Sequence, residues 1–325
     1  MVRVAINGLG RIGKTVLKIC LERKIDVVAI NDIADLETLE YLVKYDTISG
    51  KYSGKIEKGK DYLKIGNKKI KIFSEKDPEN LPWKELKVDF VVESTGLFTD
   101  REQAEKHLKA GAKKVVLSAP GKNPDITVVL GVNDKDLKRE HRIISLASCT
   151  TNCLAPVAKI IHEKYKIKKG FMTTVHAYTN DQKILDVGHK KLRRGRAGAM
   201  NLIPTSSGAT TAVAEVIPDL KGKMDGLAIR APVPCGSVVD FVAELKKSVN
   251  VDELNKTIKK GSEKLKGILE YNQDQIVSSD IIGNSCSSIF DSTLTQVNGK
   301  MIKVFAWYDN EFGYSNRVVD LLKKL

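Results

Sequence analysis

The chain has 325 residues, of which 42% are hydrophobic and 29% are charged, a composition typical of a globular protein with room for two domains. No uninterrupted apolar run is long enough to cross a bilayer, and the N-terminal segment lacks the pattern of a signal peptide, so we expect no membrane partner and a cytoplasmic location. The five cysteines are an odd number, which argues against a disulfide framework and for a reducing compartment. The formal net charge is +14, but lysines are scattered along the whole chain, whereas a nucleic-acid-binding protein gathers its charge on one face.

Short apolar runs alternate with helical patterns over the first 148 residues. Strand–helix alternation of this kind is typical of a parallel, doubly wound sheet with helices on both faces. In chain order the pattern predicts strand 2–7, helix 11–22, strand 26–31, helix 36–45, strand 88–93, helix 101–109, strand 115–117 and strand 143–147.

The pattern changes after residue 148, where a helix at 150–165 is followed by longer β-rich runs. Fewer crossovers and longer strands favour a mixed or antiparallel sheet with helices on one face. We therefore expect an α/β domain at 1–148 and an α+β domain at 149–310, with an amphipathic helix at 311–325 that packs back on the first domain. The predicted elements of the second domain are strands 171–178, 227–233, 238–245 and 301–308, with helices near 208–217 and 251–265.

Three glycines, Gly8, Gly10 and Gly13, form a G-x-G-x-x-G turn between the first strand and the first helix. In this context they predict a Rossmann-type dinucleotide site: a tight turn, close approach of the backbone to a pyrophosphate, and close packing of helix on strand. The helix N-terminus presents unpaired N–H groups to the phosphates. Asp32 ends the second strand, where a carboxylate can bind a ribose diol and repel a 2′-phosphate.

A candidate nucleophile lies where a strand stops and a helix begins. Ser148 is a suitable N-cap, which places Cys149 at the first helical position, where the positive end of the helix is expected to lower the pKa of a thiol. Its neighbours are polar, which suits a site better than a core, although a buried structural cysteine remains the alternative. Cys153 lies one turn further on and is expected to be a packed helix residue; we expect no metal site.

Of the five histidines, only His176 lies in an apolar, β-branched strand. His107 and His162 are expected on polar helix faces. A lone histidine on a strand is more often structural than catalytic, but an active cysteine commonly needs an imidazole partner in the same domain.

Four motifs together resemble the family of phosphorylating glyceraldehyde-3-phosphate dehydrogenases, in order and spacing, over residues 1–325. They are NGLGRIG at 7–13, SCTTN at 148–152, TVHAY at 174–178 and WYDNEFGYS at 307–315. The resemblance implies that the enzyme oxidises glyceraldehyde 3-phosphate with NAD and inorganic phosphate, in glycolysis or gluconeogenesis, through a thioester.

The resemblance also implies roles for individual residues. Cys149 would be the acyl-carrying thiolate and His176 its base. The implied cofactor contacts are Gly8, Gly10, Arg11, Ile12, Gly13, Asp32, Ser118 and Asn310, the last holding the nicotinamide carboxamide. The implied phosphate ligands are Thr179 with Arg230, a second group formed by Ser148, Thr150, Ser207 and Gly208, and Arg194 from the loop 179–200. That loop is one residue short relative to some relatives, so Arg193 is the alternative to Arg194.

The resemblance also bears on the choice of cofactor, on assembly and on alternative functions. Val187-Gly188 stands where many NAD-specific relatives have Leu-Pro, which leaves room for some use of NADP. A basic stretch at 190–196 is implied to pack between the subunits of a homotetramer. The alternatives are an erythrose-4-phosphate dehydrogenase of the same architecture and a nucleic-acid-binding protein that keeps a nucleotide fold; the second is disfavoured because aromatic and basic residues are not interleaved as base stacking requires.

Overall fold

The computed structural model describes residues 2–325, which form two compact units. The first holds the described residues up to Val128, together with Asp136–Ala147 and Ser315–Leu325, and the second holds Val129–Lys135 and Ser148–Tyr314. The predicted boundary after residue 148 missed one segment, because Val129–Lys135 belongs to the second unit. This segment joins the second unit because Val129 and Val132 are buried in its core.

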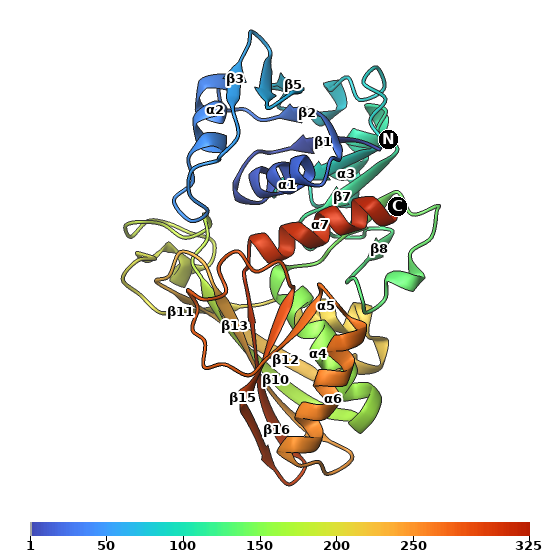
Figure 1. The fold of residues 1–325 in the computed structure, drawn as a ribbon, viewed down its shortest axis with the longest axis vertical. Coiled ribbons are helices and arrows are strands. Elements are labelled where there is room, and N and C mark those ends of the chain that lie inside the picture. Colours follow the sequence, from blue (N-terminus) through green and yellow to red (C-terminus); the bar gives the residue numbers. More distant parts are fainter. Residues whose placement is uncertain (1) are drawn as a thin grey trace. The chain divides into compact units, whose positions relative to one another are not determined.

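The first unit is built on a nine-stranded sheet in the order β3-β4-β5-β2-β1-β6-β7-β9-β8 (Figure 1). The strands from β5 to β8 pair in parallel, which confirms the predicted doubly wound sheet. The hairpins β3-β4 and β4-β5 are antiparallel additions at one edge that the sequence pattern did not predict. The strands are β1 (Arg3–Asn7), β2 (Asp26–Asn31), β3 (Ile56–Lys58), β4 (Tyr62–Ile65), β5 (Lys68–Phe73), β6 (Phe90–Glu93), β7 (Lys114–Leu117), β8 (Ile126–Thr127) and β9 (Ile143–Ser145).

Three helices contact this sheet: α1 (Arg11–Glu22), α2 (Leu36–Lys44) and α3 (Arg101–Lys109). Most of α7 (Phe312–Lys324) belongs to the same unit. The stripe of α7 is fully buried from Val318 to Leu322 except at Asp320, which bonds to Arg23 just beyond the end of α1. The terminal helix is therefore part of the first unit from Ser315 onward.

The second unit is a seven-stranded mixed sheet in the order β11-β12-β10-β13-β16-β15-β14, with α4, α5 and α6 grouped on one side (Figure 1). β10 pairs in parallel with β12 and antiparallel with β13, as the predicted mixed sheet requires. Its elements are α4 (Cys149–Tyr165), β10 (Ile167–Ala177), β11 (Ile203–Ser206), α5 (Ala209–Val216), β12 (Met224–Ala231), β13 (Ser237–Leu245), α6 (Val251–Lys264), β14 (Leu269–Asn272), β15 (Ser288–Asn298) and β16 (Met301–Tyr308).

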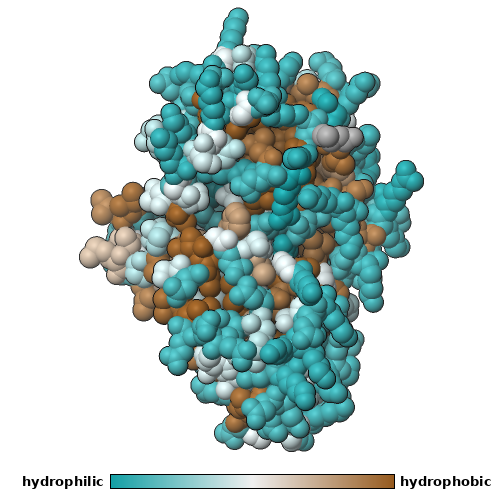
Figure 2. Space-filling view, viewed as in Figure 1, coloured by the Kyte–Doolittle hydropathy of each residue, from teal (hydrophilic) through white to brown (hydrophobic). Residues whose placement is uncertain are grey.

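On the other face of this sheet, several apolar side chains are left exposed by the described residues. Along β10 the side chains alternate, so that Met172 and Thr174 are buried whereas Phe171 and Val175 are exposed. Figure 2 shows hydrophobic residues gathered over the segment that Figure 1 colours yellow-green, near β11. Large apolar side chains of that segment are at least two-thirds exposed: Ile184, Leu185, Leu192, Met200 and Leu202.

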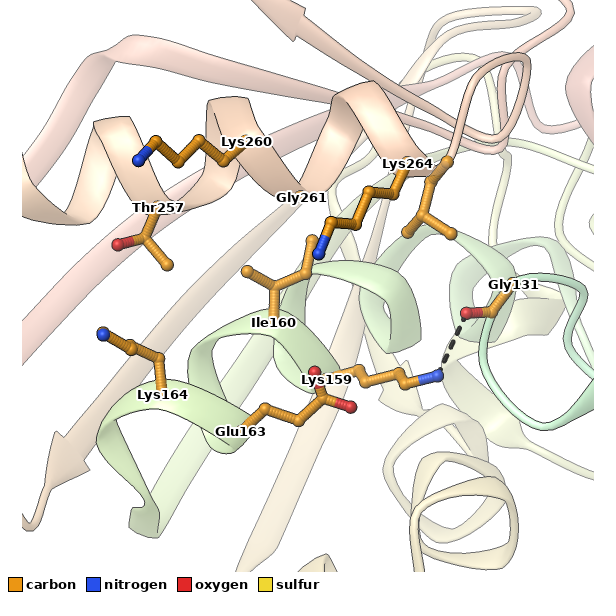
Figure 3. Close-up of a pocket in the computed structure, with 10 residues that line it drawn as sticks. Gly131, Lys159, Ile160, Glu163, Lys164, Thr257, Lys260, Gly261 and Lys264 are labelled. Carbon is orange, nitrogen blue, oxygen red and sulfur yellow. Dashed lines mark hydrogen bonds between the residues drawn. The ribbon is translucent and has the colours of Figure 1, made fainter.

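A cavity of about 410 Å³ opens between α4 and α6 (Figure 3). Lys159 lies at its edge and donates hydrogen bonds to the carbonyl oxygens of Gly131 and Val132. The cavity is lined at the C-terminal halves of both helices, where lysines complement the helix dipoles. It contains none of the sequence-predicted site residues, so we do not place the chemistry there. None of the helices described between residues 2 and 325 combines the length and apolar composition that a bilayer crossing needs.

Candidate active site

The candidate nucleophile begins helix α4. Ser148 caps the helix by accepting a hydrogen bond from the Thr151 amide at 3.1 Å, so Cys149 occupies the first helical position. The turn into the helix is sharp, since Ala147 has a φ of 53°, which non-glycine residues adopt rarely. Cys153, one turn further on, is fully buried, as expected of a packed residue.

His176 lies beside this thiol. Its Nε2 is 3.3 Å from Cys149 Sγ, and the ring packs edge-on against Tyr308, with 5.8 Å between centroids. The register of the sheet adds a cation, because His176 on β10 is the direct partner of Arg230 on β12. The second unit thus brings a thiol, an imidazole and a guanidinium together from three elements.

The electrostatics of the pair differ from the sequence-based expectation. Burial raises the pKa of the Cys149 thiol, and this effect outweighs Arg230 and the Thr150 amide, which both lower it. The expectation that the helix start alone lowers this pKa is therefore wrong for this structure. Burial, followed by the charge of Arg230, lowers the pKa of His176 to about 3. Burial therefore acts against the charged form of both groups, raising the pKa of the Cys149 thiol and lowering the pKa of the His176 ring.

Arg230 contacts the ring of His176, and Arg194 is near enough for its charge to lower the pKa of the ring. Arg230 is half-buried, and its Nε is buried without a hydrogen-bond partner among the described residues. An unpaired donor of this kind fits an oxyanion ligand. Arg194 is largely buried and donates to Thr205 and to Asp181, whereas Arg193 is exposed. These positions favour Arg194 over Arg193 as the anion ligand of the loop.

The other residues predicted to bind an anion lie at helix starts or form hydrogen bonds within the chain. Ser207 accepts a hydrogen bond from the Ala209 amide, and Gly208 is the N-cap residue of α5. The Thr179 amide donates to the side chain of Gln182. The Thr150 hydroxyl bonds at 2.9 Å to the buried Tyr308 hydroxyl, so in this structure it supports the core rather than facing a ligand.

Sequence reasoning missed Tyr308 as a member of the site. Its hydroxyl bonds to both Thr150 and Thr174, so one buried phenol ties the first turn of α4 to the strand that carries His176. Tyr308 lies within the motif at 307–315, but nothing in its spacing indicates that it contacts the residues around the thiol.

The glycine-rich turn of the first unit has the shape of a phosphate cradle. Gly8 has a φ of 89°, and a Cβ there would lie 2.8 Å from Thr95. A Cβ at Gly13 would lie 2.0 Å from the Gly8 carbonyl oxygen, whereas one at Gly10 would meet open space. The helix start therefore stays open at Gly10, where a pyrophosphate could approach the backbone.

The other cofactor residues of this unit surround the turn. Asp32 accepts hydrogen bonds from the amides of Leu9 and Ala34, at 2.6 and 3.0 Å, so its carboxylate is held at the rim. Arg11, in the first turn of α1, pairs with Asp46, and the adjacent Ile12 is partly buried. The residues present fit a dinucleotide with a free ribose diol.

Ser118 and Asn310 belong to different units. Ser118 follows β7, and its amide and hydroxyl both donate to the Glu93 carbonyl oxygen. Asn310 is buried in the second unit, where its amide oxygen accepts from the Gly236 amide and the Ser237 hydroxyl. This arrangement fixes the amide so that its nitrogen is the group available to a ligand.

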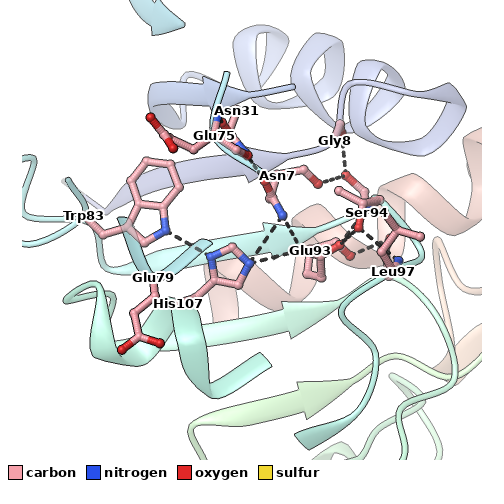
Figure 4. Close-up of polar contacts among 12 residues, drawn as sticks. Asn7, Gly8, Asn31, Glu75, Glu79, Trp83, Glu93, Ser94, Leu97 and His107 are labelled. Carbon is pink, nitrogen blue, oxygen red and sulfur yellow. Dashed lines mark hydrogen bonds and ion pairs between the residues drawn. The ribbon is translucent and has the colours of Figure 1, made fainter. Parts of the chain in front are cut away.

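A buried polar network lies beneath the glycine-rich turn (Figure 4). The Glu93 carboxylate, 2% exposed, accepts bonds from Asn7 Nδ2, from His107 Nε2, and from the amide and hydroxyl of Thr95. Trp83 donates to His107 Nδ1 at 3.1 Å, and because indole can only donate, the proton of the neutral ring lies on Nε2.

The expectation that His107 and His162 lie on polar helix faces is wrong, since both are buried, at 0% and 5% exposed. His107 serves the network beneath the turn, and His162 Nδ1 accepts from the Ile167 amide. Within residues 2–325, no three His, Cys, Asp or Glu side chains gather into a group that could hold a metal ion.

Comparison with known proteins agrees with this geometry. The family model described as glyceraldehyde 3-phosphate dehydrogenase, NAD binding domain, matches residues 2–101, and the one described as its C-terminal domain matches residues 148–310. The glyceraldehyde-3-phosphate dehydrogenase of Thermotoga maritima is 57% identical over 100% of this chain and 99% of its own. Those of Geobacillus stearothermophilus and Streptomyces coelicolor are 55% and 54% identical, each over 98% of this chain and 97% of their own. The resemblance of the four sequence motifs is thereby confirmed, and the chain belongs to the glyceraldehyde 3-phosphate dehydrogenase family.

Proposed function

We propose that this enzyme oxidises glyceraldehyde 3-phosphate with NAD and couples the oxidation to formation of an acyl phosphate from inorganic phosphate. The observation that carries the proposal is the contact of Cys149 with His176 at 3.3 Å, with Arg230 beside the ring. The relatives named above all carry the glyceraldehyde-3-phosphate name, which favours this aldehyde over erythrose 4-phosphate.

The chain's own groups account for the chemistry in two stages. Cys149 Sγ attacks the aldehyde carbon, and the carbonyl oxygen takes up a proton to give a hemithioacetal. His176 Nε2 then removes the hydroxyl proton as the carbon is oxidised to a thioester. Bound NAD supplies the hydride acceptor for that oxidation. Inorganic phosphate next attacks the thioester carbon, and Cys149 leaves as the thiolate, which is reprotonated through His176.

Both stages need anion sites, and the described residues offer two groups. Thr179 and Arg230 would hold one phosphate beside His176. Ser148, Ser207 and Gly208, with Arg194, would hold the other, and Thr150 would join them only if its hydroxyl left Tyr308. The buried, unpartnered Nε of Arg230 supports the first assignment, since a guanidinium binds phosphate through paired N–H donors.

NAD is the cofactor of this family's N-terminal domain, and Asp32 supports a preference for it over NADP. Gly8, Gly10, Gly13, Arg11 and Ile12 would bind the pyrophosphate side of the molecule. Ser118 and Asn310 would lie toward the nicotinamide, with the Asn310 amide nitrogen donating to the carboxamide. Val187 is exposed and Gly188 carries no side chain, so a 2′-phosphate is not crowded out by bulk at these positions.

Assembly into a homotetramer would cover the open sheet face of the second unit. Phe171, 69% exposed, and Leu227 lie on that face, and the apolar side chains of the loop 184–202 add to it. Contiguous apolar surface of this kind marks an interface with another protein. A second copy of the chain is the natural occupant, because the loop also carries Arg194 and needs support to hold it. All five cysteines are free thiols, which suits a cytoplasmic enzyme.

The decisive experiment is the initial rate of NADH formation from glyceraldehyde 3-phosphate, with and without inorganic phosphate, compared with erythrose 4-phosphate. We expect phosphate-dependent turnover and a higher kcat/KM for glyceraldehyde 3-phosphate. A higher kcat/KM for erythrose 4-phosphate would assign the enzyme to the alternative activity.

A further inference from the structure

The side chain of Ser237 lies where three strands of the second unit meet. Ser237 begins β13, which is placed between β10 and β16 in the sheet. Because β13 runs antiparallel to both neighbours, its first residue lies beside their last residues, and Ser237 pairs in register with Tyr308 at the end of β16. Ser237 is 1% exposed, so its hydroxyl depends on partners within the protein.

The single hydrogen of this hydroxyl is committed to Asn310. The Ala177 amide, at the end of β10, donates to Ser237 Oγ at 3.1 Å, and Asn310 Oδ1 lies 3.0 Å from the same oxygen. An amide N–H can only donate, and a hydroxyl has one hydrogen to give. The Ser237 hydroxyl therefore accepts from Ala177 and donates to Asn310, which links the end of β10 to a residue just beyond β16.

A second donor fixes which end of the Asn310 amide faces Ser237. The Gly236 amide donates to Asn310 Oδ1 at 3.2 Å. If the Asn310 amide were turned over, its NH₂ group would face the Gly236 N–H, and the Ser237 hydrogen would lose its acceptor. Gly236 is closely packed, since its φ is 87° and a Cβ there would lie 2.2 Å from the Ser278 carbonyl oxygen. Asn310 Nδ2 thus faces away from both donors and has no hydrogen-bond partner among residues 2–325.

The backbone around Asn310 is held by a different side chain. The Asp309 carboxylate, which is 2% exposed, accepts the amides of the two residues that follow Asn310, at 2.9 and 2.8 Å, through Oδ1. Its Oδ2 accepts the Gly283 amide at 2.8 Å. Because none of these bonds involves Ser237, loss of the Ser237 hydroxyl should leave the Asn310 backbone in place and free its side chain to turn.

We propose that Ser237 is a positioning residue for the cofactor. Its hydroxyl keeps the Asn310 amide nitrogen directed outward, as a donor to the carboxamide oxygen of nicotinamide, and ties this anchor to the end of the strand that carries His176. The carboxamide as the bound group rests on the proposed function. The direction of the Asn310 amide rests only on its contacts with Ser237 and Gly236.

One hydroxyl would then serve both binding and alignment. Ala177 directly follows His176 on β10, so the Ser237 hydroxyl holds the end of that strand and the nicotinamide anchor in one fixed relation. An amide that is already held in the binding orientation loses little rotamer freedom when the ligand arrives, which favours binding.

Ser237→Ala tests the inference with two ligands, NAD and ADP-ribose, which lacks the nicotinamide ring. Isothermal titration of the assembled enzyme should show NAD binding weakened by about three- to tenfold, the range that one hydrogen bond accounts for. The affinity for ADP-ribose should not change. Equal losses for both ligands would indicate a general structural role and, like an unchanged affinity for NAD, would overturn the inference.

Asn250→Ala is the matched control for a loss of stability in the second unit. Asn250 caps α6 by accepting the Glu253 amide at 2.9 Å, and it has no hydrogen bond with Ser237 or Asn310. This variant should bind NAD with the affinity of the wild type. A loss equal to that of Ser237→Ala would assign the effect to stability and contradict the positioning role.

If Ser237→Ala does not fold, the wild-type enzyme tests the orientation of Asn310 through analogues of NAD. The outward Nδ2 can only donate. 3-Acetylpyridine adenine dinucleotide keeps the carbonyl acceptor, whereas 3-aminopyridine adenine dinucleotide has a donor in its place. The acetylpyridine analogue should bind at least about threefold more tightly than the aminopyridine analogue; equal affinities or the reverse order would refute the proposal.

These titrations require neither aldehyde nor phosphate. Failure of the enzyme to oxidise glyceraldehyde 3-phosphate would therefore contradict the proposed function and leave the test of Ser237 intact.

Discussion

Replacing Glu93 by glutamine probes the network that supports the glycine-rich turn. The carboxylate has only donors around it: Asn7 and His107 at Oε2, and the amide and hydroxyl of Thr95 at Oε1. A glutamine presents one NH₂ group, which must face one of these pairs. If it faces Asn7 and His107, two buried donors lose their acceptor. If it faces Thr95, the hydroxyl can turn to accept, and only the Thr95 amide is left unpaired.

The orientation in which the NH₂ group faces Thr95 costs less free energy, so it determines the expected loss of stability. One buried donor without an acceptor costs about 1–3 kcal/mol, so Glu93→Gln should lower the free energy of unfolding by about that amount. His107 cannot relieve the alternative orientation by moving its proton, because Trp83 already donates to Nδ1. The Thr95 backbone lies so close to Gly8 that a Cβ there would clash with it, so a shift of the freed Thr95 amide should loosen the turn as well.

Urea unfolding at fixed protein concentration measures the first effect, and titration with NAD measures the second. We expect about tenfold weaker NAD binding, equivalent to about 1.4 kcal/mol, with an unchanged alkylation rate at Cys149. Glu105→Gln is the matched control, because Glu105 forms only an exposed ion pair with Arg101 on α3, worth less than about 1 kcal/mol. An unfolding free energy within about 0.5 kcal/mol of the wild type, with unaltered NAD affinity, would refute the reasoning.

The remaining predictions concern the site and the assembly. Cys149→Ser should abolish turnover and leave NAD binding intact, and labelling of Cys20 or Cys286 before Cys149 by iodoacetamide would contradict the assignment of the nucleophile. His176→Asn should slow single-turnover hydride transfer by roughly 10²–10⁴-fold; an unchanged rate would make the ring structural. Because burial raises the pKa of the Cys149 thiol, its alkylation in phosphate-free protein should keep rising as the pH increases above neutrality, and a plateau below pH 7 would contradict this. Asp32→Ala should lower the ratio of kcat/KM for NAD to kcat/KM for NADP. A wild-type kcat/KM that is higher for NADP than for NAD would overturn the role assigned to Asp32. Sedimentation should give about four times the 35.9 kDa chain mass, and a fully active species at one chain mass would contradict the tetramer.

Features that depend on neighbouring residues in the chain were predictable from the sequence. The glycine-rich turn, the strands and helix around it and the Ser148 cap all follow from local backbone requirements. The parallel and mixed sheets follow from the spacing of apolar runs. The strands β3, β4, β8, β11 and β14, which have two to four residues each, were not predicted, because such short runs carry too little periodicity to be separated from loops. The longer strands β5 and β15 were missed as well.

Features that depend on sheet register or on burial depth were not predictable. The register of β10 against β12 places Arg230 beside His176, although 54 residues separate them in the chain. His107 shows the same limit: α3 is polar by composition, and the ring is buried only because Glu93 and Trp83 come from outside the helix to meet it. A single sequence contains no signal for such pairings.

The pKa of Cys149 shows why the position at a helix start, taken alone, predicts the wrong direction of the pKa shift. A helix N-terminus stabilises a negative charge by about 0.3–1 kcal/mol, which is less than one pKa unit at about 1.4 kcal/mol for each unit. Burial can shift a pKa by up to about 3–5 units in the opposite direction. Depth around the sulfur comes from β10 and β16, which supply His176 and Tyr308, and neither is visible from residues 148–152. The direction of the pKa shift is therefore not set by the helix start alone, and His176, whose Nε2 lies 3.3 Å from Cys149 Sγ, is the group placed to take the proton of the thiol.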